Sequence, residues 1–259
     1  MTLWDSYIYF ALAAVTCWVT GAAFGWKERR ALSVGLTAAG LVVFLAYILM
    51  MWHTLERPPL RTMGETRLWY VLLLPLAGLA VYLRHGYRWI LLCSTMLATV
   101  FAAINVFKPE IHEKTLMPAL QSPWFAPHVI VYMLAYAILG AATLMALYAL
   151  FSYPKNSSNR ERIRESTDEI VTVGWAFLTT GMLFGALWAK EAWGHYWSWD
   201  PKETWAAITW MAYLVHIHWN GQSRLRYGWL LFCFILLQMC WWGINYLPSA
   251  QGISVHTYT

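Results

Sequence analysis

The stretch PHVIVYMLAYAILGAATLMALYALF, residues 127–151, decides the class of fold. It contains no Asp, Glu, Lys or Arg. A helix needs about 20 consecutive, mostly apolar residues to cross the hydrocarbon core of a bilayer. This stretch is longer than that, and it therefore predicts a transmembrane helix.

The same pattern recurs along the chain. The run at 68–83 is short and contains Pro75, and the run at 203–219 is short and polar at its start. We expect an all-α, polytopic integral membrane protein with about eight transmembrane helices, forming a single membrane domain over 1–259. The first run is expected to be a span and not a cleaved signal, because no basic segment precedes it. The other runs that meet or approach the required length lie at 4–26, 31–52, 89–107, 170–189 and 227–247.

The composition agrees with a membrane protein. The chain is 59% hydrophobic and 12% charged, whereas soluble domains carry roughly 25% charged residues. We interpret the net charge of +5 as a topology signal and not as a nucleic-acid-binding surface. The chain has no CxxCH, so it is not expected to carry c-type haem itself. The four cysteines are expected to pack as small apolar side chains: Cys17, Cys93, Cys233 and Cys240.

The charged residues predict which side of the membrane each loop faces. The segments 27–30, 84–88, 153–169 and 220–226 together hold eleven Lys and Arg and five acids, which leaves seven basic residues and eight acids for the opposite side. Because basic residues accumulate on the cytoplasmic side, the first group is expected to be cytoplasmic. Both termini are then extracytoplasmic.

The segment WGHYWSWDPKETW, residues 193–205, holds four tryptophans within thirteen residues. Pro201 ends any preceding helix, and Asp200 is a candidate N-cap for the helix that follows. The tryptophans allow two interpretations. They could anchor the chain at the bilayer interface, or they could form a platform for a flat aromatic ligand such as haem.

The segment resembles the WGxxWxWD signature, called WWD, of the haem-handling protein superfamily. Its continuation PKETWAAITW is similar to the CcsA (ResC) family of System II cytochrome c synthases. The similarity also covers WFAPHVIVYMLAY, RPPLRTMGETRLWY and SVHTYT, and so most of the chain from about residue 53. The fixed positions of the signature are filled by Trp193, Gly194, Trp197, Trp199 and Asp200.

The resemblance implies how haem is held. Residues 190–202 would be an extracytoplasmic haem-binding loop, with Trp193, Trp197, Trp199 and Asp200 positioning haem b and no nucleophile supplied by the chain. His128 and His256 match the two axial ligands of the external haem iron. Without the resemblance, His128 reads as an interfacial histidine and His256 as a residue of a mobile tail.

A second haem position is implied for His218, within the membrane. It lies eighteen residues after Asp200, or about 27 Å along a helix, so it cannot ligate the external iron. His216 is about 200° around the same helix, so only one of the two can face a given haem, and spacing favours His218. Its axial partner would belong to a separate CcsB (ResB) subunit.

The resemblance implies an enzyme subunit, a holocytochrome c synthase of haem lyase type that is active with CcsB in the bacterial cytoplasmic membrane. It would present haem for thioether attachment to CxxCH of apocytochrome c outside the membrane, with help from thiol-reducing proteins, and haem export is a further expectation. A haem exporter or chaperone like CcmC, a b-type cytochrome and a non-haem transporter stay open as alternatives. His53, His112 and His195 receive no role. Candidate partners for the haem propionates are Arg57, Arg61, Arg67 and Lys202.

Overall fold

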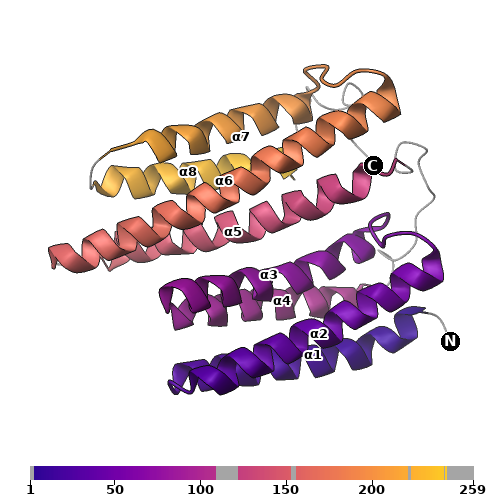
Figure 1. Cartoon of the computed structure of the whole chain (residues 1–259), viewed down its shortest axis with the longest axis horizontal. Helices are drawn as coiled ribbons and strands as arrows, with labels where there is room; N and C mark the ends of the chain where they lie inside the picture. The colour runs from indigo at the N-terminus through magenta and orange to yellow at the C-terminus, as the bar shows by residue number, and fades with distance from the viewer. Residues whose placement is uncertain (1–2, 109–121, 153–155, 221–222, 242, 244–259) are drawn as a thin grey trace. The chain divides into compact units, whose positions relative to one another are not determined.

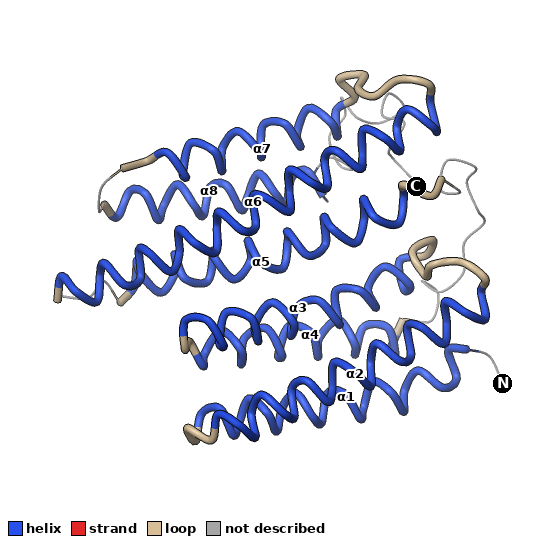
Figure 2. The backbone as a smooth tube through the Cα atoms, viewed as in Figure 1, coloured by secondary structure: helices blue, strands red, loops and turns tan. Residues whose placement is uncertain are grey.

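The computed structural model describes residues 3–108, 122–152, 156–220, 223–241 and 243. Within these ranges the chain forms eight α-helices and no strand (Figures 1 and 2). The helices are α1 (Leu3–Trp26), α2 (Arg30–Leu55), α3 (Met63–His85), α4 (Arg88–Phe107), α5 (Phe125–Phe151), α6 (Ser157–Trp193), α7 (Pro201–His218) and α8 (Arg224–Trp241).

Each apolar run coincides with one helix, so the all-α, multi-pass prediction is confirmed. The helices α1 to α6 are long and apolar enough to cross a membrane, and α7 and α8 have 18 residues each. Pro75 lies inside α3 without ending it. The last residues of the run 227–247, other than Gly243, lie outside the described residues.

Helix α6 is much longer than its apolar run at 170–189. It begins at Ser157, where the Asn156 side chain accepts a hydrogen bond from the Ser158 N–H. Its first turns are charged, and Arg164 pairs with Glu161 and Asp168 along the helix. Ion pairs three and four residues apart stabilise a helix without adding hydrophobicity, which is why a search for apolar runs finds only the second part of α6.

The chain divides into two compact units, Met1–Leu120 and Gln121–Thr259. In the first, α1 contacts α2, α2 contacts α3, α3 contacts α4, and α4 returns to α1. In the second, α5 contacts α6, α6 contacts α7, α7 contacts α8, and α8 returns to α5. Each unit is therefore a four-helix arrangement in which neighbours in sequence are neighbours in space. That the whole chain forms a single membrane domain stays a prediction.

The first unit has an aromatic core. The Tyr7 hydroxyl donates to the Ala102 carbonyl over 3.1 Å, and the ring of Tyr7 contacts those of Phe44 and Tyr47. Helices α3 and α4 cross closely at Gly78, where a Cβ would lie 1.8 Å from the Ser94 Oγ. Only a glycine fits such a crossing.

The loop between α2 and α3 is fixed by a buried ion pair. Both Nη atoms of Arg57 donate to the Glu65 carboxylate over 2.8 Å, and the Arg61 N–H donates to the same carboxylate over 2.7 Å. Glu65 is buried, and Thr62 caps α3 by accepting from its N–H. Burial and the neighbouring Arg57 lower the pKa of Arg61, partly offset by Glu65.

Candidate functional site

The Trp-rich segment forms a loop between α6 and α7. Helix α6 ends at Trp193, and Gly194 follows in the left-handed conformation with φ of 86°. Its N–H donates to the Lys190 carbonyl, while the Lys190 ammonium donates to the Gly194 carbonyl over 2.8 Å. The start of α5, the end of α6 and the start of α7 lie at the same end of the second unit (Figure 1). The signature therefore occupies one end of a helical bundle.

Asp200 is the N-cap of α7, as the sequence predicts. Its Oδ1 accepts from the Lys202 N–H over 2.8 Å, and Pro201 occupies the first helical turn. Asp200 is buried, with 7% of its surface exposed. The Asp200 side chain therefore accepts a hydrogen bond from the backbone of the helix that it caps.

The indoles of Trp197 and Trp199 meet edge to face, with their ring centroids 5.8 Å apart. The Trp199 side chain is exposed, with 70% of the residue accessible, and its backbone is left-handed with φ of 60°. The Nε1 of Trp197 is buried and has no hydrogen-bond partner among the residues that the structure describes. Buried N–H groups normally have an acceptor, so a ligand that brings oxygen atoms to this loop fits the side chains present.

His128 lies in the first turns of α5 and contacts α6. Its Nδ1 is 2.8 Å from the Gly181 carbonyl oxygen. Because a carbonyl can only accept, Nδ1 carries the proton and Nε2 carries the lone pair. A histidine that donates from one ring nitrogen to a backbone carbonyl is oriented in the way that metal-binding histidines are. The residue fits an axial ligand of iron.

Two aromatic ring contacts connect His128 to the WWD signature. The ring of His128 stacks on Trp188 with centroids 5.5 Å apart, and Trp188 contacts Trp193 with centroids 4.9 Å apart. Trp188 is buried. The structure therefore connects His128 to Trp193 through Trp188, a residue that the sequence does not single out.

Two glycines of α6 make room for this arrangement. A Cβ on Gly185 would lie 2.8 Å from the Cε1 and Nδ1 of His128, and a Cβ on Gly181 would lie 2.4 Å from the ring of Tyr132. The spacing Gly181-x-x-x-Gly185 places both on one face of the helix. This small-x-x-x-small pattern is a sequence signal for a close helix contact, and it could have predicted where α5 meets α6.

Comparison with known proteins decides the family. A profile of the family described as cytochrome c assembly protein matches residues 5–250 of the chain. The chain belongs to this family. Membership confirms the predicted resemblance to this family.

Several curated relatives that the chain matches carry the name CcsA. It is 35% identical over 181 residues to the cytochrome c biogenesis protein CcsA of Chlamydomonas reinhardtii, covering 64% of the chain and 49% of the relative. It is 33% identical over 207 residues to CcsA of Prochlorococcus marinus strain SARG, covering 63% of each. The chain thus spans about half to two thirds of the length of these relatives.

A solved structure has the same fold. The cytochrome c haem lyase CcmF matches 93% of this chain with a TM-score of 0.63, at 19% sequence identity and over 46% of its own length. At this identity the match concerns the fold alone. It shows that both four-helix units follow a helical arrangement already seen in a larger protein.

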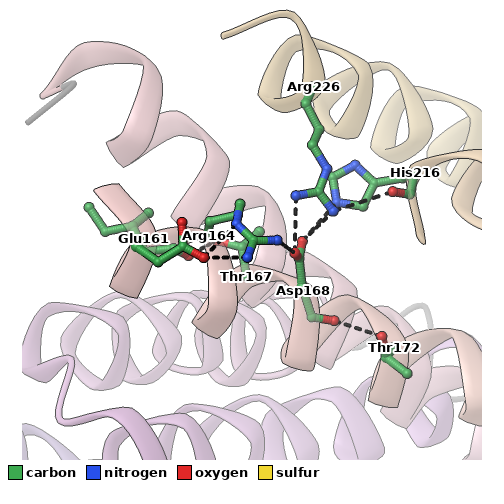
Figure 3. Close-up of polar contacts among 8 residues, drawn as sticks. Glu161, Arg164, Thr167, Asp168, Thr172, His216 and Arg226 are labelled. Atoms are coloured by element: carbon green, nitrogen blue, oxygen red, sulfur yellow. Dashed lines mark hydrogen bonds and ion pairs between the residues drawn. The ribbon is translucent and has the colours of Figure 1, made fainter. Parts of the chain in front are cut away.

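A partly buried cluster of charged side chains lies at the other end of the second unit, where α7 ends and α8 begins (Figures 1 and 3). The Nη1 of Arg226 in α8 donates to the Oδ2 of Asp168 in α6 over 3.0 Å, and Nη2 lies 2.6 Å from Oδ1 as an ion pair. The Nε2 of His216 on α7 is 3.7 Å from the Asp168 Oδ1. His216 and Arg226 are buried. The cluster ties three helices together, and no feature of the sequence reasoning anticipated it.

His218 is placed differently from His216. It is the last residue of α7 and is exposed, and its Nδ1 is 2.9 Å from the Leu214 carbonyl oxygen. The carbonyl again assigns the proton to Nδ1 and the lone pair to Nε2. Of the two histidines, His218 is thus the accessible one, and its role as a haem ligand stays a prediction.

The remaining predicted residues fall in several places. His256 and His112 lie outside the described residues. His53 at the end of α2 and His195 in the Trp-rich loop are exposed. Arg57, one of the candidate propionate partners, is bonded to Glu65. Arg61 belongs to the same loop, and Lys202 lies in the first turn of α7. Arg67 lies in α3, and its buried Nη1 has no hydrogen-bond partner within the described part of the chain.

Proposed function

We propose that the chain is the haem-presenting part of a cytochrome c synthase. The observation that carries this proposal is the geometry of His128, whose Nδ1 bond to the Gly181 carbonyl leaves the lone pair on Nε2 and whose ring stacks on Trp188 beside Trp193. Membership of the cytochrome c assembly family supports the reaction class.

His128 and His256 are proposed to hold the iron of an external haem b from opposite faces. Two imidazoles keep haem iron six-coordinate. Trp193, Gly194, Trp197, Trp199 and Asp200 would form the loop that grips the macrocycle edge. The buried Trp197 N–H and the exposed Trp199 indole support this role, because they offer a hydrogen-bond donor and a large flat surface.

The chain is proposed to act by positioning. Apocytochrome c brings its own CxxCH thiols, kept reduced by thiol-reducing proteins, and each thiol adds across one vinyl group of the haem. In well-oriented systems, holding the reacting groups in place can lower the activation barrier by about 7–11 kcal/mol. The CxxCH histidine of the product is then proposed to replace His128 or His256, which releases the product.

His218 is proposed as the ligand of a second haem within the membrane, with its axial partner in a CcsB-type subunit. Its exposed position at the end of α7 supports a partner outside this unit. Haem would pass from the cytoplasmic side toward the extracytoplasmic loop of a bacterial cytoplasmic membrane. The assignment of the loops to the two sides of the membrane rests on the distribution of Lys and Arg, because basic residues accumulate on the cytoplasmic side.

The proposal is tested with His128→Ala in the full chain purified from membranes with its partner. We expect loss of the external haem and of its low-spin spectrum, with partial recovery on adding imidazole, which enters the space left by the side chain. His195→Ala is the matched control, because it removes an exposed histidine from the loop itself, and it should keep the haem. Unchanged haem in His128→Ala would contradict the proposal.

A haem exporter or chaperone without bond-making is the second candidate, since the same side chains would serve it. The two are separated by expressing the chain and its partner in cells that lack other synthases, together with a CxxCH substrate. Covalent haem on the substrate supports the synthase. Haem bound to the chain with none on the substrate supports the exporter.

A further inference from the structure

The backbone at Trp199 has an uncommon conformation for such a residue. Its φ of 60° lies in the left-handed region, which large side chains rarely adopt. The residue is 70% exposed, so burial of its indole does not hold the backbone there. Contacts on either side of Trp199 must hold it instead.

Those contacts converge on one carboxylate. The Oε2 of Glu203 accepts from the Ser198 N–H over 2.7 Å, from the Ser198 hydroxyl over 3.2 Å and from the Asp200 N–H over 3.2 Å. Ser198 and Asp200 are the two neighbours of Trp199 in the chain. The carboxylate thus bonds the backbone immediately before and immediately after the left-handed residue.

This arrangement is more than an ordinary helix cap. In a capping box the third residue of the helix bonds only the N–H of the N-cap, which here is the bond from Asp200. The two additional bonds to Ser198 extend the same carboxylate across Trp199. Glu203 is also buried, with 9% exposed, so water competes little for these bonds.

A fourth contact closes the turn. The Thr204 hydroxyl donates to the Trp199 carbonyl over 3.2 Å. The first turn of α7 therefore bonds residues 198, 199 and 200. The Trp199 indole meets the Trp197 indole edge to face.

We propose that Glu203 is a positioning residue for the Trp199 indole, holding it outward as part of the haem-gripping surface without touching haem itself. This inference rests on the proposed function of the loop. It separates two roles within one short segment, because Trp199 contacts the ligand while Glu203 fixes the direction in which Trp199 points.

The backbone part of the inference is tested by hydrogen–deuterium exchange on the full chain in detergent. Glu203→Gln keeps the size of the side chain but replaces the carboxylate with an amide, which is a weaker acceptor for several N–H donors. We expect faster exchange in the peptide covering residues 195–200, with unchanged exchange in α5 as a check on folding. Unchanged exchange at 195–200 would overturn the inference, whatever the loop binds.

The functional part is tested by a double-mutant cycle on haem affinity. Glu203→Gln should weaken haem binding on the order of tenfold, as expected for loss of hydrogen bonds to a buried charged group. Trp199→Gly removes the indole and accepts the left-handed backbone without strain. In that background the effect of Glu203→Gln should fall below about twofold, because coupled residues are not additive.

Glu165→Gln is the matched control. Glu165 is an exposed acid of α6 outside residues 190–202, so its loss removes a charge from the same unit without touching residues 198–200. It should leave haem affinity unchanged. Additive effects of the Glu203 and Trp199 substitutions would overturn the inference, whereas absence of haem from the unmutated chain would overturn the proposed function and leave the exchange result to judge Glu203.

Discussion

Asp168 of α6 and Arg226 of α8 form a two-pronged ion pair, with the Arg226 Nη2 2.6 Å from Oδ1 and Nη1 3.0 Å from Oδ2. The Arg226 Nη2 also lies 3.4 Å from the His216 carbonyl oxygen of α7. The pair therefore joins three helices at the end of the second unit opposite the Trp-rich loop. The Nη1 hydrogen bond and the second close N–O contact together hold the guanidinium against the carboxylate.

Arg226→Gln is expected to destabilise the second unit by about 2 kcal/mol, because it removes a hydrogen bond between two charged groups, while Asp168 keeps Arg164 as a second partner. Roughly 2–4 °C of melting temperature corresponds to each kcal/mol in a protein of this size. A fall of roughly 4–8 °C should therefore appear in thermal unfolding of the purified protein in detergent.

Arg164→Gln is the control for that experiment. Arg164 also bonds Asp168, at 3.2 Å, but it lies on the same helix and its side chain is 31% exposed. A partly exposed pair within one helix contributes about 0.3–0.5 kcal/mol. A melting temperature lowered as much by Arg164→Gln as by Arg226→Gln would show that burial and the link between helices are not what make the pair important.

Gly185→Ala is expected to displace His128. The added methyl would lie 2.8 Å from the Cε1 and Nδ1 of the imidazole, so the ring must move and its bond to the Gly181 carbonyl must lengthen. Bound haem should decrease and its Soret band should shift, which absorption spectroscopy of the purified protein measures.

Gly228→Ala provides the comparison, since a Cβ on Gly228 in α8 meets nothing within 4 Å. Alanine favours helix over glycine by about 0.8–1 kcal/mol, so this variant should be slightly more stable and keep its haem. If Gly185→Ala behaves in the same way, the close contact between α6 and His128 has no functional weight.

Substitutions at Asp200 distinguish capping from charge. Asp200→Asn keeps an N-cap side chain of nearly equal quality, whereas Asp200→Ala removes the bond to the Lys202 N–H and costs about 1 kcal/mol. We expect the asparagine variant to keep haem and the alanine variant to lose part of it, measured as haem per protein. Loss in both would indicate that the carboxylate charge acts directly.

His216 and His218 should differ in what their loss affects. His216→Ala removes a fully buried ring beside Asp168 and should cost about 2 kcal/mol of stability. His218→Ala removes an exposed side chain and should change stability by less than about 0.5 kcal/mol. The His218 variant should nevertheless lose the proposed intramembrane haem.

Melting temperature and haem stoichiometry, measured on the same preparations with the partner subunit, report the two effects separately. Retention of two haems by His218→Ala would remove it from the ligand set. A stable His216→Ala protein lacking one haem would assign the ligand to His216 instead.

The helices and the Trp-rich loop could be predicted from the amino-acid sequence. Apolar runs of about 20 residues have few alternatives to membrane-length helices, so all eight positions were predictable. Asp200 before Pro201 likewise predicted the start of α7, because capping depends on residues that are adjacent in the chain. The Trp-rich signature identified the loop for the same reason, since all its members lie within one short segment.

Contacts between residues that are distant in the chain could not be predicted in this way. Trp188 reads in the sequence as one more tryptophan in an apolar helix, and its stacking on His128 depends on how closely Gly181 and Gly185 let α5 approach. His216 is buried and His218 is exposed, and the burial of His216 depends on Asp168 and Arg226, which face α7 from two other helices. Local sequence governs a helix and its caps, whereas side-chain contacts between helices depend on crossing geometry that no single segment encodes.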